Sequence, residues 1–106
     1  MSDYRLVLSN APVDEAPALA KRLVEERLAA CVNVLPAARS FYVWRGEICD
    51  DAESVMLIKT TAARAARLAE RLVELHSYDV PEVIAIDLAD GDARHLEWLA
   101  SSVSSP

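Results

Sequence analysis

The chain has 106 residues, of which 53% are hydrophobic and only two are glycine, and its formal net charge is −6. This length suits one domain with one core over residues 1–106, and the high apolar content excludes a disordered chain. The basic residues are scattered and form no basic run, so a nucleic acid is not an expected partner.

The N-terminal residues and the cysteines indicate the compartment. Residues 1–5 lack the basic and long apolar regions of a signal peptide, and no apolar run approaches the ~20 residues of a membrane span. We therefore expect a cytoplasmic protein that does not bind membranes. In that compartment Cys31 and Cys49 are expected to be thiols rather than a disulfide.

The first third of the chain alternates between strand and helix patterns. Residues 4–9 form a short apolar run that predicts a strand. Asp14 is the expected N-cap of a helix, because apolar residues recur at helical spacing over residues 16–28. Residues 31–35 return to a strand pattern, and Pro36 indicates an edge strand or a bulge.

The middle of the chain predicts a long β-hairpin. Residues 40–44 resume the strand and residues 48–60 return from a polar turn. A strand of about a dozen residues spans about 40 Å, whereas a domain of this size has a radius of gyration of about 13 Å. The hairpin should therefore overhang its own sheet. Its overhang carries four consecutive apolar residues: Phe41, Tyr42, Val43 and Trp44. That is too much apolar surface to leave in water, so we expect burial against other copies of the chain.

The last third predicts two more helices and one more strand. Thr61 is the expected cap of a helix whose apolar stripe runs to His76. Residues 82–88 are β-branched and apolar on both faces, which predicts a central strand. An amphipathic helix that carries Leu96, Leu99 and Val103 follows. The order β-α-β-β-α-β plus a C-terminal helix predicts an α+β, ferredoxin-like split βαβ fold, with helices on one face of the sheet.

Several separated motifs come in a fixed order along the chain. They are Arg27–Asn33, Tyr42–Trp44 followed by Gly46, Ile58–Thr60, His76–Glu82 and Leu96–Leu99. In these motifs the sequence closely resembles the CutA family of divalent-cation tolerance proteins, from about Tyr4 to Leu99. The resemblance implies a ferredoxin-like subunit in a tight homotrimer, with long hairpins packed between neighbours. It also implies a role in tolerance of, or response to, copper and other divalent cations.

The chain departs from the family pattern at two places. Members commonly have His-Pro-Tyr-Glu where this chain has His76-Ser77-Tyr78-Asp79. Some bacterial members carry a cysteine, a proposed copper ligand, at the end of the first strand, where this chain has Ser9. A serine hydroxyl is not the soft thiolate that favours copper, so that ligand is missing here.

The candidate metal ligands are His76 and Glu82. Imidazole suits copper and zinc, and a carboxylate can complete a site. One histidine and one glutamate are not a high-affinity set within one subunit. We therefore expect weak binding of copper or another divalent cation and no required cofactor. The alternative for His76, at the end of an apolar stripe, is a packing role in the core or at an interface.

A second candidate site is a cleft formed by Lys59, Trp44 and Tyr78. Lys59 precedes a helix start, where anions bind, and the aromatic residues can stack on a ligand. By analogy of fold with the PII signalling proteins, the alternative function is a regulatory trimer that senses a small anionic ligand in inter-subunit clefts. The alternatives are an ion pair with an acidic residue for Lys59 and packing at an interface for Trp44, and the residues favour these alternatives.

No catalytic residues are predicted. The chain has no Ser-His-Asp order, CxxC pair, phosphate-binding glycine-rich loop or HExxH motif. The expected function is that of a trimeric, cytoplasmic CutA-like protein in divalent-cation tolerance, and not that of an enzyme.

Overall fold

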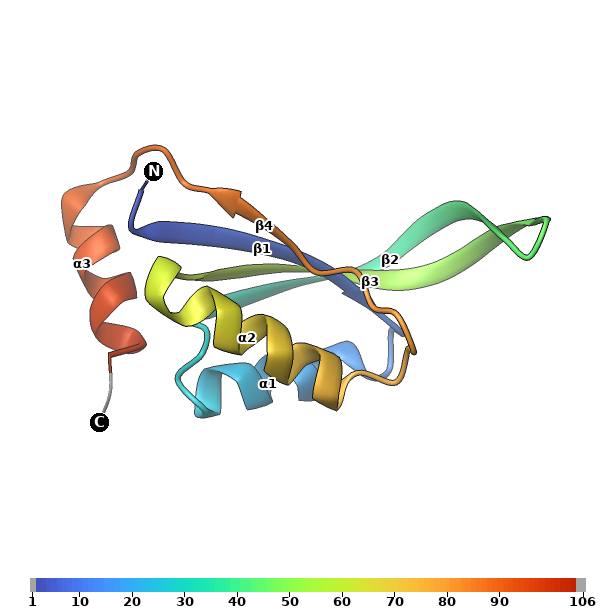
Figure 1. The fold of residues 1–106 in the computed structure, drawn as a ribbon, viewed down its shortest axis with the longest axis horizontal. Coiled ribbons are helices and arrows are strands. Elements are labelled where there is room, and N and C mark those ends of the chain that lie inside the picture. The colour runs from blue at the N-terminus through green and yellow to red at the C-terminus, as the bar shows by residue number, and fades with distance from the viewer. Residues whose placement is uncertain (1, 105–106) are drawn as a thin grey trace.

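The computed structural model describes residues 2–104 as one antiparallel sheet and three helices (Figure 1). The elements follow in the order β1 (Tyr4–Ala11), α1 (Ala16–Glu25), β2 (Cys31–Trp44), β3 (Glu47–Thr61), α2 (Ala62–Leu75), β4 (Ile84–Asp87) and α3 (Ala93–Ser102). The strands lie in the order β2-β3-β1-β4. This order confirms the predicted split βαβ fold. Within the described part of the chain, no helix is both long and apolar enough to cross a bilayer.

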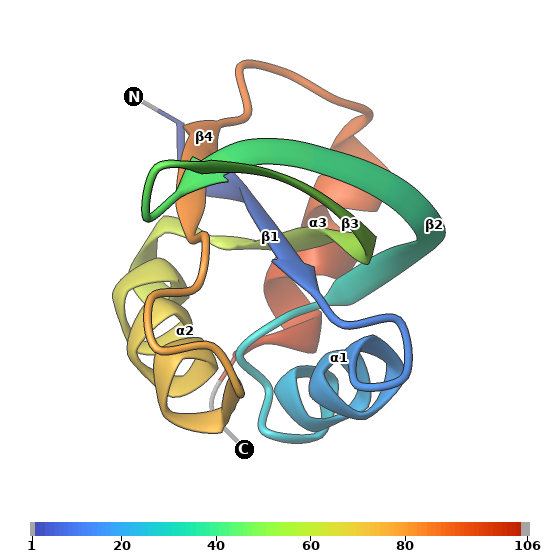
Figure 2. The same cartoon turned by 90° about the vertical axis from the view of Figure 1, so that its right-hand side faces the viewer.

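The core lies between one face of the sheet and the helices α1 and α2, which lie side by side below it in Figure 2. Side chains alternate along a strand, so Met56 and Ile58 of β3 both point toward the helices and are fully buried. Leu23 of α1 and Leu68 and Leu72 of α2 pack against them, because the apolar residues of each helix form one stripe. Burying each of these side chains contributes about 1.5–3 kcal/mol.

The helix starts agree only in part with the predicted caps. The N-cap of α1 is Glu15 rather than Asp14, and its side chain makes no capping bond. Pro17 in the first turn already removes one of the donors that a cap would satisfy. Thr61 occupies the predicted N-cap position of α2, but its side chain makes no capping bond either. Asp92 is the N-cap of α3, and its carboxylate accepts hydrogen bonds from two backbone N–H groups.

β4 is an edge strand, and the prediction of a central strand over residues 82–88 was wrong. It spans only Ile84–Asp87 at the end of the strand order. Ile84 pairs with Leu8 and Ile86 pairs with Leu6, so these side chains share the sheet face opposite the helices. Both isoleucines remain exposed. The strand is apolar because that second face is apolar, and not because strands flank it on both sides.

The β2–β3 hairpin overhangs the sheet as predicted. A register shift between Leu35 and Ala38 interrupts the pairing beside Pro36, and beyond it the strands pair as far as Trp44 and Glu47. We call residues 38–53 the hairpin arm. It projects beyond both the sheet and the helices in Figure 1, and the molecule measures 45 Å along its longest axis against 26 and 21 Å across.

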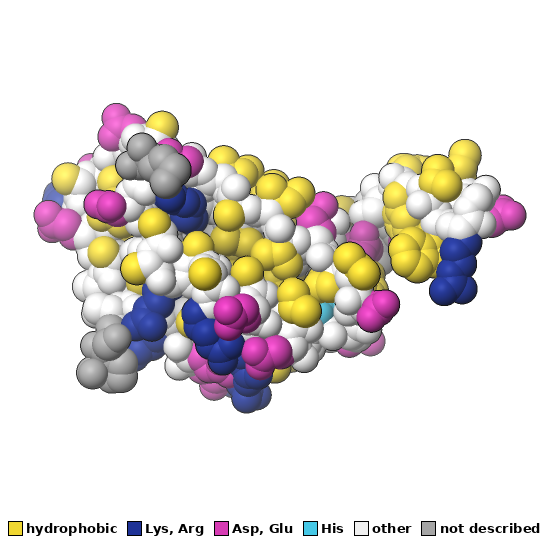
Figure 3. All heavy atoms as spheres, in the orientation of Figure 1, with side chains coloured by type: hydrophobic (Ala, Val, Ile, Leu, Met, Phe, Trp, Pro, Cys, Tyr) yellow, Lys and Arg dark blue, Asp and Glu magenta, His cyan; other side chains and the backbone are white. Residues whose placement is uncertain are grey.

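Apolar side chains cover this projection and are not buried by the rest of the chain. Figure 3 shows hydrophobic side chains gathered on the projecting hairpin. All four residues of Phe41–Trp44 are exposed, and Ile48 on the returning strand is 79% exposed. A two-stranded hairpin with neither face packed is marginally stable by itself. The arm therefore needs a covering surface that this chain alone does not supply.

Candidate functional site

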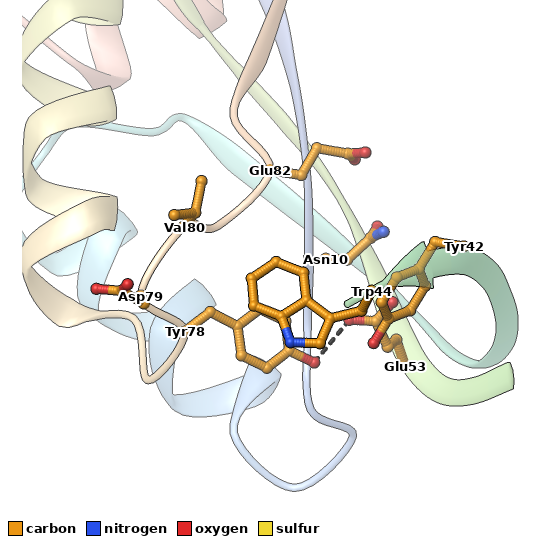
Figure 4. Close-up of a pocket in the computed structure, with 8 residues that line it drawn as sticks. All are labelled: Asn10, Tyr42, Trp44, Glu53, Tyr78, Asp79, Val80 and Glu82. Carbon is orange, nitrogen blue, oxygen red and sulfur yellow. Dashed lines mark hydrogen bonds between the residues drawn. The ribbon is translucent and has the colours of Figure 1, made fainter. Parts of the chain in front are cut away.

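A cleft of about 390 Å³ opens where the hairpin arm meets the segment that joins α2 to β4 (Figure 4). Its lining comes from three strands and that segment: Asn10, Tyr42, Trp44, Glu53, Tyr78, Asp79, Val80 and Glu82. The topology brings them together for a simple reason. β4 lies beside β1, so the chain leaving α2 must cross the end of the sheet from which the arm projects.

Two tyrosine hydroxyls at the cleft donate hydrogen bonds to carboxylates. Tyr78 Oη donates to Glu53 Oε2 over 2.6 Å, and Tyr42 Oη donates to Asp51. Burial, followed by the bond to Glu53, raises the pKa of Tyr78 above its usual range. The bond to Asp51 is the main cause that raises the pKa of Tyr42 from 10.0 to about 12. Both phenols therefore stay neutral donors well above neutral pH.

Glu53 is the most enclosed charged side chain of the cleft. It is only 6% exposed, and the Tyr78 hydroxyl is its hydrogen-bond donor. No lysine, arginine or histidine among residues 2–104 lies within the 4.0 Å of an ion pair with it. The carboxylate is thus held in place by a neutral group and lacks a countercharge.

His76 is buried at the end of α2, and both of its ring nitrogens have backbone partners. The N–H of Tyr78 donates to Nδ1 over 3.0 Å. Nε2 therefore carries the ring proton and donates it to the carbonyl oxygen of Asn10 over 2.7 Å. The ring also packs against Tyr78, with the ring centroids 4.7 Å apart. His76 ties the segment after α2 to β1, and in this arrangement neither nitrogen is free for a metal ion.

Only one of the two candidate metal ligands lines the cleft. Glu82 is exposed in the lining of the cleft, whereas His76 is buried and does not line it. Among the described residues, no group of three or more His, Cys, Asp and Glu side chains is placed to hold a metal ion. Ser9, at the position of the family cysteine, is fully buried on the helix side, and its hydroxyl has no hydrogen-bond partner.

The second predicted group is also brought together only in part. Trp44 and Tyr78 both line the cleft, but Lys59 does not. Lys59 pairs with Leu6, four residues along β1 from Asn10, which places it about 13 Å away along the strand. The cleft therefore offers an anionic ligand no lysine, arginine or histidine in its lining.

The two cysteines are free thiols, as predicted. They lie at opposite ends of the hairpin strands, Cys31 at the start of β2 and Cys49 near the turn that begins β3.

Four lining residues were not among those predicted from the sequence: Asn10, Glu53, Asp79 and Val80. One feature could have indicated Glu53. It is an acidic residue that directly precedes Ser54, where the alternation of buried and partly exposed residues along β3 begins. The bulge beside Pro36 places it opposite Ala38, at the base of the arm. Nothing in the sequence pattern indicated that the segment after α2 would fold back onto it.

Comparison with known proteins gives consistent matches over nearly the whole chain. The family model described as CutA1 divalent ion tolerance protein matches residues 5–102. The divalent-cation tolerance protein CutA of Thermus thermophilus is 47% identical over 95 residues, which covers 89% of this chain and 92% of that protein. These matches agree with the resemblance carried by the sequence motifs.

Solved structures give the same result. The crystal structure of CutA from Xylella fastidiosa superposes with a TM-score of 0.94 at 39% identity, covering 97% of this chain and 100% of that chain. The structure described as PII-like protein CutA from Nostoc sp. PCC 7120 in apo form superposes with a TM-score of 0.90 at 31% identity, covering 94% and 97% of the two chains.

Proposed function

This chain belongs to the CutA1 divalent ion tolerance family, and we propose that it acts in the cytoplasm as a homotrimer in the response to divalent cations such as copper. Family membership supports the role in cation tolerance. The observation that carries the assembly is the hairpin arm, whose exposed apolar side chains need a partner surface.

A second surface supports self-association. The sheet face opposite the helices carries an apolar patch, in which Leu8 lies between Ile84 of β4 and Leu57 of β3. Each chain thus presents two separate apolar surfaces, the arm and the open sheet face. Such a pair fits a closed ring in which each copy contacts the next, and three copies is the number that the family resemblance implies.

In this proposal any divalent cation binds weakly, and no cofactor is required. The proposed ligands are His76 and Glu82. To bind an ion, His76 must release Asn10 or Tyr78, and leaving a buried backbone group unpaired costs about 1–3 kcal/mol. That cost accounts for a low affinity.

Solution mass tests the assembly. Light scattering should give the mass of three chains in buffer, with EDTA and with added copper, because the contacts are apolar and do not involve metal. A single-chain mass in buffer would contradict the proposal. A trimer that forms only with copper would also contradict it and would place metal at the centre of the assembly.

Calorimetry with copper and zinc tests the proposed ligands. We expect weak, saturable binding that His76→Ala abolishes. His95→Ala is the matched control, because His95 is exposed on α3 and does not line the cleft. Binding that survives His76→Ala unchanged would rule out His76 as a ligand.

A further inference from the structure

We infer that the cleft between the hairpin arm and the segment after α2 binds a small organic ammonium ion. Every charged residue in its lining is acidic: Glu53, Asp79 and Glu82. The ligand for which the cleft is complementary in charge is therefore a cation, opposite in sign to the anion expected from the sequence. This inference does not depend on the proposed function.

The aromatic residues of the cleft favour a cation with an apolar body. Tyr42 and Trp44 of β2 and Tyr78 of the opposite wall are all partly exposed there (Figure 4). An ammonium group within about 6 Å of such a ring is attracted by the negative face of its π system. The indole of Trp44 already attracts one cation, because the guanidinium of Arg45 lies 5.6 Å from its ring centroid. Arg45 itself does not line the cleft.

The environment of Glu53 independently indicates a positively charged ligand. A glutamate that is only 6% exposed is normally paired with a cation, since removing its charge from water is costly. The hydroxyl of Tyr78 binds one of its oxygens but brings no charge. A ligand ammonium group beside Glu53 would provide the missing countercharge and would lie close to the ring of Tyr78.

The spacing of the carboxylates favours an organic ion over a metal ion. A metal ion needs several oxygen ligands that converge on one point. The acidic side chains of the cleft do not form such a group. Their charge is instead spread over the walls of a cleft of about 390 Å³, which is within the usual size range of small-molecule sites. A molecule in the cleft can lie beside the carboxylate of Glu53 and the ring of Tyr78 at the same time.

Binding of matched small molecules tests the sign of the charge. Calorimetry would compare choline and 1,4-diaminobutane with 3,3-dimethylbutan-1-ol, the neutral isostere of choline, and with 2-oxoglutarate as an anion. We expect at least one ammonium compound to bind, and the neutral and anionic compounds to bind at least about tenfold more weakly. Failure of both ammonium compounds to bind would overturn the inference, as would equal binding of the neutral isostere or the anion.

Substitutions test the location. Glu53→Gln removes the charge and keeps an acceptor for the Tyr78 hydroxyl, so we expect binding to weaken about tenfold. Glu47→Gln removes the same charge at the turn of the arm, outside the cleft, and should change binding less than about twofold. Trp44→Leu removes one ring of the cleft and keeps an apolar side chain, so it should weaken binding several-fold even if Glu53→Gln does not fold.

The same variants separate a ligand from a neighbouring copy. A basic side chain of another copy of this chain could also supply the cation. In that case Glu53→Gln would lower the mass measured by light scattering, and choline would not bind the wild type. That result would overturn the ligand site and would support the proposed assembly of the wild type. Choline binding by a single-chain protein would instead support the site and contradict the assembly.

Discussion

The helix-covered body and the hairpin arm use the same kinds of apolar residue, but only the body buries them. Leu23, Met56 and Leu68 are fully buried between the sheet and the helices, whereas Val43 is 67% exposed on the arm. The comparison shows that an apolar pattern predicts burial without saying whether the covering surface belongs to the same chain. In this protein the helix-covered face of the sheet is complete by itself and the arm is not.

The charged groups follow the same division. In the body, Arg71 of α2 reaches across to Glu26 of α1, with Nε 2.8 Å from Oε1, and also pairs with Glu74. In the arm, Arg39 and Asp50 form an exposed pair at 2.6 Å, which contributes at most about 1 kcal/mol. The Arg71–Glu26 pair thus joins two helices of the body, whereas the Arg39–Asp50 pair links two strands that already pair along their backbones.

The largest expected effect is on the core of the body. Leu72→Ala should lower the free energy of unfolding by about 2–5 kcal/mol, because Leu72 is fully buried beneath α2. Ile48→Ala removes a similar side chain from the arm and should change the free energy of unfolding of the dissociated chain by less than about 0.5 kcal/mol. Urea unfolding at low protein concentration measures both. Equal losses would remove the distinction between body and arm.

The next effect concerns the contact that closes one side of the cleft. His76→Ala leaves the Asn10 carbonyl and the Tyr78 N–H without their partner, so we expect a loss of about 1–3 kcal/mol. His95→Ala, on the exposed face of α3, should be close to neutral in the same unfolding experiment. If the two variants were equally stable, His76 would not hold the segment to β1.

An effect that depends on acid pH should appear in the body. Hydrogen bonds from Arg71 and then Arg22 lower the pKa of Glu26 from 4.5 to about 2. Because the folded-state pKa is the lower one, the stabilisation is present above pH 4.5 and is lost as the pH falls toward 2.

Melting temperatures of wild type and Glu26→Gln would measure this effect. Wild type should melt higher at pH 6, and the two should converge near pH 2. Glu25→Gln, on the exposed side of α1, is the matched control. A difference between wild type and Glu26→Gln that did not change with pH would contradict the ion-pair explanation.

The smallest expected effect is on the tyrosine of the arm. The pKa of Tyr42 is raised to about 12, mainly by its bond to Asp51, so the bond stabilises the fold below pH 10 and is lost as the pH rises through 12. Asp51→Asn should bring the ionisation of Tyr42 back toward pH 10 in a near-ultraviolet absorbance titration. Tyr42→Phe removes this phenol and so identifies which part of the absorbance change belongs to Tyr42. No change in Asp51→Asn would show that Asp51 does not hold the phenol.

Local patterns predicted the fold but only part of the site. The hairpin, both helices of the body and the overhang follow from periodicity and strand length, which are local properties. The place of β4 was wrong because an apolar strand at an open sheet face has the same pattern as a central strand. Glu53 was missed because its burial depends on the bulge beside Pro36 and on Tyr78, which lies 25 residues farther along the chain.

Hydrogen exchange of the backbone amides tests most directly whether the arm is stabilised by other copies of the chain. The experiment compares wild type with the double variant Phe41→Ser, Val43→Ser. In wild type we expect residues 39–51 to be protected nearly as well as residues 54–60 of β3. In the variant the mass should fall to one chain and the arm should exchange at least about a hundredfold faster, while residues 54–60 keep their protection. An arm that stays protected in a single chain would contradict the account.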